Sequence, residues 1–286
     1  MDSSNFPLVS IGMPVFNEER FLRQSLESLV QQDYPNIELL ISDNASTDNT
    51  AKICQEYSQK YDWITFNSLK SNLGPANNFN AVKDSSTGKY FMWAAGHDLW
   101  STNYISSCVN LLESHPKAVI AYGSSHWIDG YNKPFSREFG WTDTRGMDVI
   151  ARYFTVFWGN MHPILGVIRK DIIDQYTLNN IVGMDLIILS HLILKGDFIH
   201  AKEENWSRRE FRIESSHNDK IKRYQSKDYG LATSLLDKFF PLARLPLALS
   251  KAVIQSKHPL PVRLLITFLL IPSFPVRYIS GKRNKN

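Results

Sequence analysis

Strand-like and helix-like stretches alternate along the first 122 residues with a repeat of about 27 residues. The apolar runs of strand length are residues 8–15, 37–42, 64–66, 90–95 and 118–122. Each of the first four is followed by a segment with helical periodicity. We expect the first helix to open at residues 17–19 and the third to follow a loop at residues 71–78. Such alternation is typical of β-α-β units, whose parallel strands form one sheet with helices on its faces. We therefore expect an α/β fold with a mostly parallel sheet flanked by helices.

The turn after the first apolar run lacks the glycine-rich loops that bind phosphates in two large enzyme classes. Residues 13–18 read MPVFNE, where a dinucleotide-binding fold carries G-x-G-x-x-G. The sequence also contains no G-x-x-x-x-G-K-[ST] loop. Hydride transfer and P-loop nucleotide hydrolysis are therefore poorly supported.

The N-terminus and the cysteines both favour a reducing compartment. Residues 1–7 hold neither a basic region nor an apolar core, so no secretory signal is expected. The two cysteines, Cys54 and Cys108, lie in segments that read as helix, where a free cysteine behaves as a small buried hydrophobe. We expect the protein to be cytoplasmic.

Charge is divided unevenly along the chain. Residues 1–201 contain 15 Lys and Arg against 21 Asp and Glu, whereas residues 202–286 contain 17 against 7. Basic termini bind nucleic acid or an anionic membrane surface. Stretches such as 239–247 and 264–271 are too apolar for a nucleic-acid arm, so we expect no nucleic-acid partner.

The uncharged run 264–276 has 13 residues and two prolines, which is short of the roughly 20 residues needed to cross a bilayer. We therefore expect the C-terminal region to lie in the plane of a membrane surface. The alternative is a helical appendage that packs on the main domain and exposes a solvated basic face.

The run 90–95 ends at small residues and is followed directly by His97 and Asp98. In open α/β sheets, ligands bind at the carboxyl ends of the strands. These two side chains are therefore candidates for a binding site. Alternatively, Asp98 or Ser101 caps a helix that begins near Thr102.

Four polar segments follow the strands in a fixed order. They are residues 14–19 (PVFNEE), 42–50 (SDNASTDNT), 72–78 (NLGPANN) and 96–98 (GHD). Together they resemble the motifs of inverting family 2 glycosyltransferases, which have a GT-A fold, and the resemblance covers about the first 215 residues. It implies transfer of a sugar from a nucleoside-diphosphate sugar to an acceptor hydroxyl with inversion.

The resemblance implies a role for each matching residue. Those implied to bind the sugar nucleotide are Pro14, Phe16, Asn17, Glu18, Asp43, Asn44, Ser46, Asn72, Gly74, Asn78 and His97. Asp98 falls where the family's Asp-x-Asp motif ligates a metal, which implies a divalent cation, Mn²⁺ or Mg²⁺, as cofactor. The donor's chemistry agrees, since its diol or base needs a carboxylate and its diphosphate a hard cation held by carboxylate oxygen.

Several of these residues have a second interpretation. The sequence Ala-Gly-His-Asp stands where the family usually has two or more aspartates, so His97 is either a nitrogen ligand favouring Mn²⁺ or a hydrogen-bond donor to the diphosphate or sugar. We favour the donor, because one His beside one Asp is not a complete coordination set. Asp43 alternatively forms an Asx turn, Ser46 a helix cap, and Asn72 and Asn78 ordinary turns.

Beyond residue 122 the pattern loosens. We expect a loop at 123–146, a helix around 150–157, a strand at 164–168, an apolar helix from 184 to 195, an edge strand or loop at 206–212 and a polar helix from about 218. The family has an acidic pair at a helix start, and Asp185 stands in that place, which implies that Asp185 is the general base. Alternatively, Asp185 is a helix N-terminal carboxylate favoured by the dipole. Arg208 and Arg209 either meet the diphosphate or line a solvated face.

We therefore expect a GT-A domain at 1–215, with a nucleotide-sugar-binding half at 1–122 and an acceptor half at 123–215, and a basic helical extension at 216–286. The expected acceptor is lipid-linked or a glycan, in surface polysaccharide or glycolipid assembly on the cytoplasmic face of a membrane. The competing hypothesis is a non-catalytic binder of sugar nucleotides or glycans whose metal motif has degraded.

Overall fold

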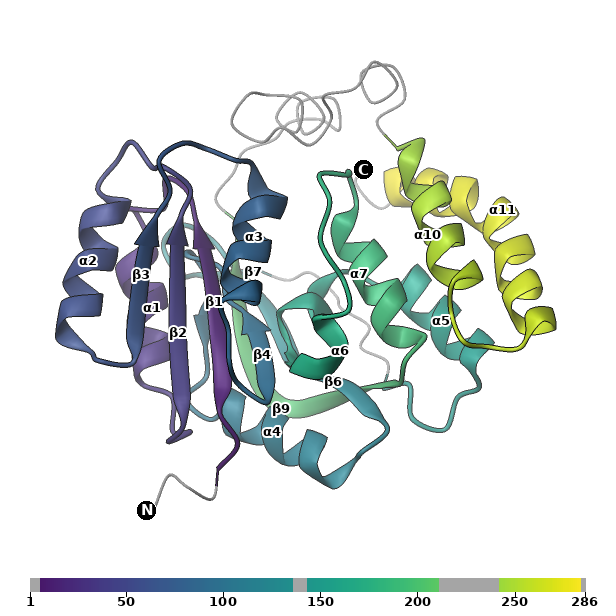
Figure 1. The fold of residues 1–286 in the computed structure, drawn as a ribbon, viewed down its shortest axis with the longest axis horizontal. Helices are drawn as coiled ribbons and strands as arrows, with labels where there is room; N and C mark the ends of the chain where they lie inside the picture. Colours follow the sequence, from purple (N-terminus) through teal and green to yellow (C-terminus); the bar gives the residue numbers. More distant parts are fainter. Residues whose placement is uncertain (1–5, 136–142, 211–241, 284–286) are drawn as a thin grey trace.

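One mixed β-sheet forms the centre of the molecule (Figure 1). The computed structural model describes residues 6–135, 143–210 and 242–283. Within these residues nine strands form a single sheet in the order β3-β2-β1-β4-β8-β6-β9-β5, and β7 pairs with β6 outside this path. Helices cover both faces of the sheet, so the expected α/β class is confirmed.

The first half alternates strictly between strands and helices. Its elements are β1 (Val9–Val15), α1 (Leu22–Val30), β2 (Ile37–Asp43), α2 (Thr50–Lys60), β3 (Ile64–Ser68), α3 (Pro75–Asp84) and β4 (Tyr90–Trp93). The four strands pair in parallel in the order β3-β2-β1-β4, as the sequence pattern predicts. Their carboxyl ends consequently lie at one edge of the sheet.

Two helix boundaries differ from those expected. The helix expected to open at Asn17 begins at Leu22, because Asn17 has a φ of 54° and residues 17–21 form turns. The helix after Gly74 begins at once with Pro75, so Asn78 lies inside α3 instead of in a loop. Proline favours such a start because its missing N–H has no partner in the first turn of a helix.

The second half is less regular. Its elements are β5 (Leu99–Trp100), α4 (Tyr104–Ser114), β6 (Ala118–Ile128), β7 (Pro134–Phe135), α5 (Val149–Trp158), the 3₁₀ turn η2 (His162–Leu165), β8 (Val167–Arg169), α6 (Lys170–Ile173), α7 (Met184–Ile193), β9 (Asp197–Arg209), α10 (Arg244–Ile254) and α11 (Leu260–Arg283).

Three of our expectations for this half are wrong. The fifth strand runs on to Ile128, where we expected a loop from residue 123. The strand expected at 164–168 is a 3₁₀ turn followed by the short β8. Residues 206–209 end the 13-residue strand β9, which lies inside the sheet between β6 and β5 and not at its edge. The polar helix expected from about 218 lies outside the described residues.

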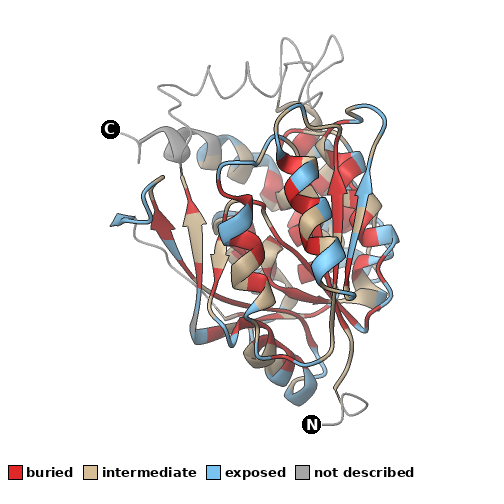
Figure 2. Cartoon of the chain, turned by 90° about the vertical axis from the view of Figure 1, so that its left-hand side faces the viewer, coloured by how far each residue is buried: buried red, intermediate tan, exposed pale blue. Residues whose placement is uncertain are grey.

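The sheet separates two hydrophobic clusters. Figure 2 shows buried residues along the strands, and helices that carry both buried and exposed positions. Successive residues of β4 point to opposite faces, so Tyr90 and Met92 join one cluster and Phe91 and Trp93 join the other. The first cluster is covered by α1, α2 and α4 and the second by α5 and α7. The second also contains buried residues of α10 and α11, among them Leu249, Val253 and Ile266. The two C-terminal helices therefore pack on the main domain.

Candidate active site

The loops after β1 and β2 are bonded to each other at the carboxyl edge of the sheet. Val15 lies opposite Asp43 in the parallel pairing of the two strands. Beyond this point the N–H of Asn17 donates to Oγ of Ser46 at 2.9 Å, and Oδ1 of Asn17 accepts the N–H of Thr47 at 2.9 Å. The structure therefore brings together the first two predicted motifs. Phe16 and Glu18 flank Asn17 on the same partly exposed turn, and Pro14 lies within β1.

Asp43 is fixed at the end of β2. It is 1% exposed, and its carboxylate accepts hydrogen bonds from the N–H and Oγ of Ser46 and, at 3.2 Å, from Oγ of Ser68. Both the predicted turn-forming role and a position at the binding edge are compatible with this geometry. A group anchored by three donors presents a fixed oxygen position to anything bound above it.

The backbone between Asn44 and Ser46 is strained. Ala45 has a φ of 61°, a left-handed conformation that costs an alanine about 1 kcal/mol or more but costs glycine little. This conformation turns the N–H of Ser46 towards the carboxylate of Asp43. Glycine would adopt this conformation with little strain, so Ala45 keeps the turn at an energetic cost.

The segment before α3 is tied to the β2 loop by asparagine side chains. Nδ2 of Asn44 donates to Oδ1 of Asn72 at 2.9 Å, and Oδ1 of Asn44 accepts the N–H of Leu73 at 2.9 Å. Gly74 has a φ of 82° and donates its N–H to Oδ1 of Asn72 at 2.8 Å. The third motif thus reaches the same edge of the sheet as the first two.

Asn78 does not belong to this loop. It is 3% exposed on α3, and its Nδ2 donates to the carbonyl oxygens of Ser42 at 3.0 Å and Val15 at 3.3 Å. Asn78 therefore holds α3 against the ends of β1 and β2, and our expectation of a loop residue is wrong.

His97 contacts Glu18 across the edge. Its Nδ1 lies 3.0 Å from both carboxylate oxygens of Glu18, and its Nε2 lies 3.8 Å from Oδ1 of Asp98. The side chains of His97 and Glu18 are 17% and 11% exposed. This contact links the first motif to the fourth and leaves part of the imidazole open to the edge.

Asp98 is buried, and both its oxygens are engaged within the protein. The indole N–H of Trp206 donates to Oδ2 at 3.0 Å, and the N–H of Arg209 donates to Oδ1 at 2.9 Å. The side chain is 2% exposed, and this burial raises the pKa of Asp98 above its ordinary value. Asp98 therefore joins the turn after β4 to strand β9.

These surroundings do not fit the divalent cation expected at Asp98. A hard cation requires several carboxylate, carbonyl or water oxygens that converge on it. Within the described residues, no group of three or more His, Cys, Asp and Glu side chains is arranged to hold a metal ion. Both oxygens of Asp98 already accept N–H groups, so the reaction proposed below uses no cation at this residue.

Arg209 is also a buried structural residue, which contradicts both of our interpretations of it. It is 3% exposed, and its guanidinium donates to the carbonyl of His97 at 2.8 Å, to Oδ1 of Asn132 at 2.5 Å and to Oε1 of Gln24 at 3.0 Å. Burial lowers its pKa from the ordinary value for arginine. Arg208 instead packs over the ring of Trp127 at 4.6 Å.

One buried polar cluster beside Asp98 could not be predicted from local sequence patterns. His162 is 4% exposed, its Nδ1 lies 2.5 Å from Oγ of Ser125, and its ring packs edge-on against Trp127 and Trp206. Ser125 and His162 lie 37 residues apart on different elements, so no local spacing marks them. Through Trp206 the cluster adjoins Asp98.

Asp185 lies in the first turn of α7 and is partly buried. The segment before α7 is fastened to α3, since Asn80 exchanges two hydrogen bonds of 2.9 Å with the backbone of Leu178, and Oδ1 of Asn180 accepts the N–H of Ala76. Because α3 begins at the third motif, the start of α7 is tied to the same edge of the sheet.

Gly183 sets the start of α7. It has a φ of 90°, and a Cβ at this position would lie 2.7 Å from a methyl carbon of Leu245 on α10. The left-handed backbone conformation therefore favours glycine two residues before Asp185, and the small residue lets Leu245 of α10 approach closely.

Comparison with known proteins agrees with this fold. The family model described as "Glycosyl transferase family 2" matches residues 10–176, which is more than half of the chain. The chain is 33% identical over 124 residues to the uncharacterized glycosyltransferase RP339 of Rickettsia prowazekii, covering 43% of this chain and 38% of that protein. It is 37% identical over 110 residues to the putative glycosyltransferase EpsE of Bacillus subtilis, covering 38% and 40%. The match thus spans about two fifths of these relatives.

Solved structures share the fold at low identity. Residues 1–349 of TarS from S. aureus, in complex with UDP-GlcNAc, superpose with a TM-score of 0.68 at 14% identity, covering 97% of this chain and 74% of that one. The mannosyltransferase PcManGT from Pyrobaculum calidifontis, in complex with GDP-Man and Mn²⁺, superposes with a TM-score of 0.58 at 17% identity, covering 98% and 85%. The GT-A architecture expected from the sequence is therefore confirmed.

Proposed function

The chain belongs to glycosyl transferase family 2, and we propose that it moves a sugar from a nucleoside-diphosphate sugar to an acceptor hydroxyl with inversion at the anomeric carbon. The observation that carries the proposal is the convergence of three polar loops at the carboxyl edge of the parallel strands. The Asn17–Ser46 and Asn44–Asn72 hydrogen bonds hold these loops together.

The donor is proposed to bind along this edge. Asn17 is exposed there and Glu18 and His97 are partly exposed, while Asp43 behind them fixes the β2 loop. Polar groups that are already held in place lose little freedom on binding, which favours recognition of a ribose and a diphosphate. The fold neighbours that were solved with UDP-GlcNAc and with GDP-Man support a nucleotide sugar as the donor class.

The proposed reaction is one in-line displacement. The carboxylate of Asp185 takes the proton of the acceptor hydroxyl, the hydroxyl oxygen bonds to the anomeric carbon, and the bond from that carbon to the diphosphate oxygen breaks. The nucleoside diphosphate leaves with the bonding electron pair. The position of Asp185 in a helix tied to α3 supports this role.

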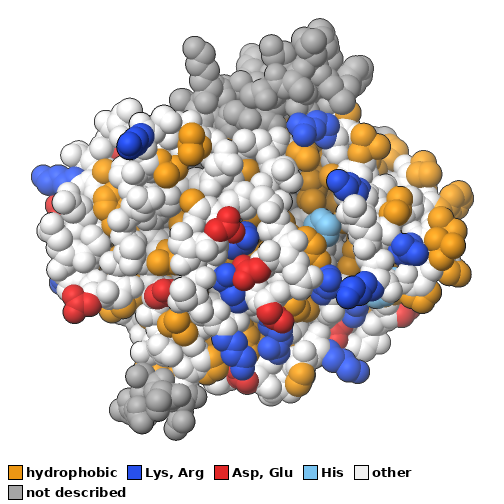
Figure 3. All heavy atoms as spheres, in the orientation of Figure 1, with side chains coloured by type: hydrophobic (Ala, Val, Ile, Leu, Met, Phe, Trp, Pro, Cys, Tyr) orange, Lys and Arg blue, Asp and Glu red, His pale blue; other side chains and the backbone are white. Residues whose placement is uncertain are grey.

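The C-terminal helices support an acceptor that is lipid-linked or lies near a membrane. By length and composition α11 could cross a membrane, since the window Leu260–Arg277 has a mean hydropathy of 1.5 and is 11% buried. One face nevertheless packs on the domain through Ile266 and Leu270, and Arg277 donates to the carbonyl of Gly159 at 3.0 Å. The opposite face exposes apolar side chains, which Figure 3 shows gathered along the edge that α11 forms.

We therefore propose that α11 lies in the plane of the cytoplasmic membrane surface while staying attached to the domain. An in-plane helix keeps Ile266, Leu270 and Arg277 in their protein contacts and places the exposed apolar face in the lipid boundary. Assembly of a surface polysaccharide or glycolipid is the process that such an arrangement would serve.

A binder without catalytic activity is the second candidate, and the engagement of both oxygens of Asp98 within the protein favours it. Purified protein incubated with a panel of UDP-, GDP- and dTDP-sugars, with and without Mn²⁺, separates the two. Release of free nucleoside diphosphate by hydrolysis or transfer supports the enzyme. Saturable binding of a sugar nucleotide without release of nucleoside diphosphate would support the non-catalytic binder. If no sugar nucleotide binds, both candidate functions are contradicted.

A further inference from the structure

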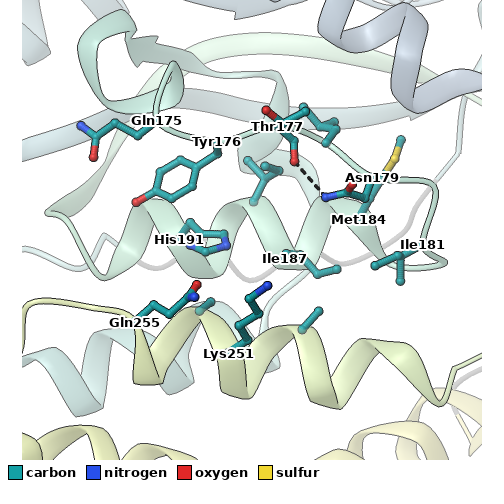
Figure 4. A pocket seen from close by; sticks show the side chains of 14 residues that line it. Gln175, Tyr176, Thr177, Asn179, Ile181, Met184, Ile187, His191, Lys251 and Gln255 are labelled. Atoms are coloured by element: carbon teal, nitrogen blue, oxygen red, sulfur yellow. Dashed lines mark hydrogen bonds between the residues drawn. The ribbon is translucent and has the colours of Figure 1, made fainter.

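A cavity of about 360 Å³ lies between α7, α10 and the segment 175–181 (Figure 4). It adjoins a second cavity of about 400 Å³, and both are lined by Gln175, Tyr176, His191, Ala252 and Gln255. None of the three polar loops of the proposed donor site lines either cavity. The volume of each cavity lies within the roughly 300–1,000 Å³ range of small-molecule sites.

The floor of the cavity is aromatic and neutral. The rings of Tyr176 and His191 stack with centroids 4.2 Å apart and an interplanar angle of 28°. Burial and the neighbouring charge of Lys195 lower the pKa of His191 to about 4, so its imidazole is uncharged near neutral pH. Figure 4 shows Tyr176 above His191 and the side chains of Lys251 and Gln255 directed from α10 towards α7.

The charged groups on the cavity are all basic. Lys251 lines the first cavity, and Lys195 and Lys257 line the second. No Asp or Glu lies among the described residues that line either one. Lys195 donates to Oε1 of Gln175 at 2.9 Å, which orients that amide at the rim. A cavity with ammonium groups and no carboxylate selects an anionic ligand.

The rim of the cavity continues into an exposed apolar surface. Leu247 and Ile254 are 69% and 51% exposed, and with Lys251 they occupy positions i, i+4 and i+7 of α10, which lie on one helix face. The neighbouring α11 exposes Leu264 and Phe268 to 57% and 67%. Residues 244–277 contain five Lys and Arg and no Asp or Glu. A surface with apolar side chains around a lysine suits the membrane interface, where acyl chains meet the phosphate groups of the lipids.

We propose that the cavity between α7 and α10 binds a phosphate group carried by a membrane lipid, with Lys251 as its principal cationic contact. This inference rests on the membrane attachment proposed above for α11. The phosphate belongs either to a bilayer phospholipid or to a lipid-linked acceptor, since both carry the same phosphate ester chemistry. Met184 lines the cavity and precedes Asp185, so the cavity extends to the first turn of α7, which also carries the proposed base.

The test is co-sedimentation of the full chain with vesicles of phosphatidylcholine alone, with added phosphatidylglycerol, or with an added polyprenyl phosphate. A lysine near a membrane surface contributes about 1 kcal/mol to binding, so Lys251→Gln is expected to weaken binding to phosphate-rich vesicles about fivefold. Lys251→Arg keeps the charge and is expected to bind like the unaltered chain. Lys52→Gln on the distant α2 is the matched control and is expected to change binding little.

The vesicle that shows the Lys251-dependent increment identifies the source of the phosphate. Equal losses for Lys251→Gln and Lys52→Gln, or no increment with either phosphate lipid, would overturn the proposal. Lys251-dependent binding of soluble inorganic pyrophosphate without a vesicle increment would overturn the lipid source. If the unaltered chain binds none of the vesicles, membrane attachment itself is contradicted. If it binds vesicles but no sugar nucleotide, only the proposed sugar transfer is contradicted.

Discussion

The carboxylate of Asp98 accepts the indole N–H of Trp206 at 3.0 Å, although the two residues lie 108 positions apart in the chain. Asp98 follows the last parallel strand of the first half, and Trp206 belongs to β9, the long strand of the second half. This hydrogen bond and that from the N–H of Arg209 fasten the two halves together behind the proposed donor site.

We expect Asp98 and Trp206 to be energetically coupled. Asp98→Asn and Trp206→Phe each leave a buried polar group without a partner, which lowers the free energy of unfolding by about 1–3 kcal/mol. The double variant is expected to lose about 0.5–3 kcal/mol less than the sum, as measured by urea unfolding in a double-mutant cycle. Asp62→Asn, at an exposed position, is the control. Strict additivity would contradict the coupling.

The same Asp98→Asn variant tests the role of the cation. Because both oxygens of Asp98 face the protein, we expect the variant to bind sugar nucleotide with the same response to Mn²⁺ as the unaltered chain. Isothermal titration with and without Mn²⁺ measures this response. A folded Asp98→Asn protein that has lost only its Mn²⁺-dependent affinity would make Asp98 a metal ligand after all.

Asp185→Asn is expected to keep donor binding and lose sugar transfer. Removing a general base lowers the rate by about 10²- to 10⁴-fold, while the amide preserves the shape of the side chain. The comparison is kcat for transfer and Kd for the donor, with Asp171→Asn on the exposed face of α6 as the control. Turnover close to that of the unaltered chain would remove Asp185 from the reaction.

Ala45→Gly is expected to raise the free energy of unfolding by about 1 kcal/mol. The φ of 61° strains alanine but not glycine, and this relief exceeds the entropy that glycine adds to the unfolded chain. Ala81→Gly inside α3 supplies the opposite case, since glycine in a helix interior costs about 1 kcal/mol. Denaturant unfolding of both variants measures the signs, and destabilisation by Ala45→Gly would contradict the strain.

Acidification is expected to destabilise the protein through His191. Its pKa is 6.5 when unconstrained and about 4 in the folded chain, so between these values the unfolded state binds a proton that the folded state does not. Stability is thus fully present above pH 6.5 and falls towards pH 4, by at most about 3 kcal/mol at 1.36 kcal/mol per pKa unit.

His191→Phe keeps the ring stack with Tyr176 and removes the titration. The unaltered chain should therefore lose more stability than the variant as the pH falls from 7 to 4.5, measured by unfolding at each pH. Identical pH dependence of the two proteins would show that His191 does not titrate in this window.

Membrane attachment is better tested by surface substitution than by removing the C-terminal helices. Leu245, Leu249 and Val253 of α10 belong to the second hydrophobic cluster, so deletion would expose the core. Phe268→Ser acts on a side chain that is 67% exposed and is expected to weaken vesicle binding about tenfold without lowering Tm. Ile266→Ser, at a fully buried position, should instead lower Tm.

The parallel half of the fold could be predicted because its signals are local. Apolar runs and helical periodicity specify β1 to β4, and turn-forming residues mark their ends. The sequence predicts too early a start for α1, because Asn17 and Glu18 resemble a helix start. Asn17 instead adopts a left-handed backbone conformation and bonds to Ser46 and Thr47.

The second half could not be predicted to the same depth because long-range pairing decides it. β6 continues to Ile128 because β9 runs parallel beside it, with a register shift between Gly123 and Ser124, and β7 pairs with its last residues. Arg209 looked like a ligand-binding or surface residue, and its partners His97, Asn132 and Gln24 come from three distant segments. No periodicity within the sequence encodes such a set.

The contact between Leu245 and Gly183 gives the C-terminal helices a geometric consequence. A Cβ on Gly183 would lie 2.7 Å from Leu245, so the backbone two residues before Asp185 rests directly on α10, whose exposed face carries Leu247. If α10 and α11 rest on a bilayer, the height of Asp185 above the lipid is then set by the thickness of α10, which is about 10 Å with its side chains. An acceptor hydroxyl would have to extend by that distance from the lipid to reach Asp185. The thickness of α10 would thus set a minimum length for the group that joins the hydroxyl to its lipid.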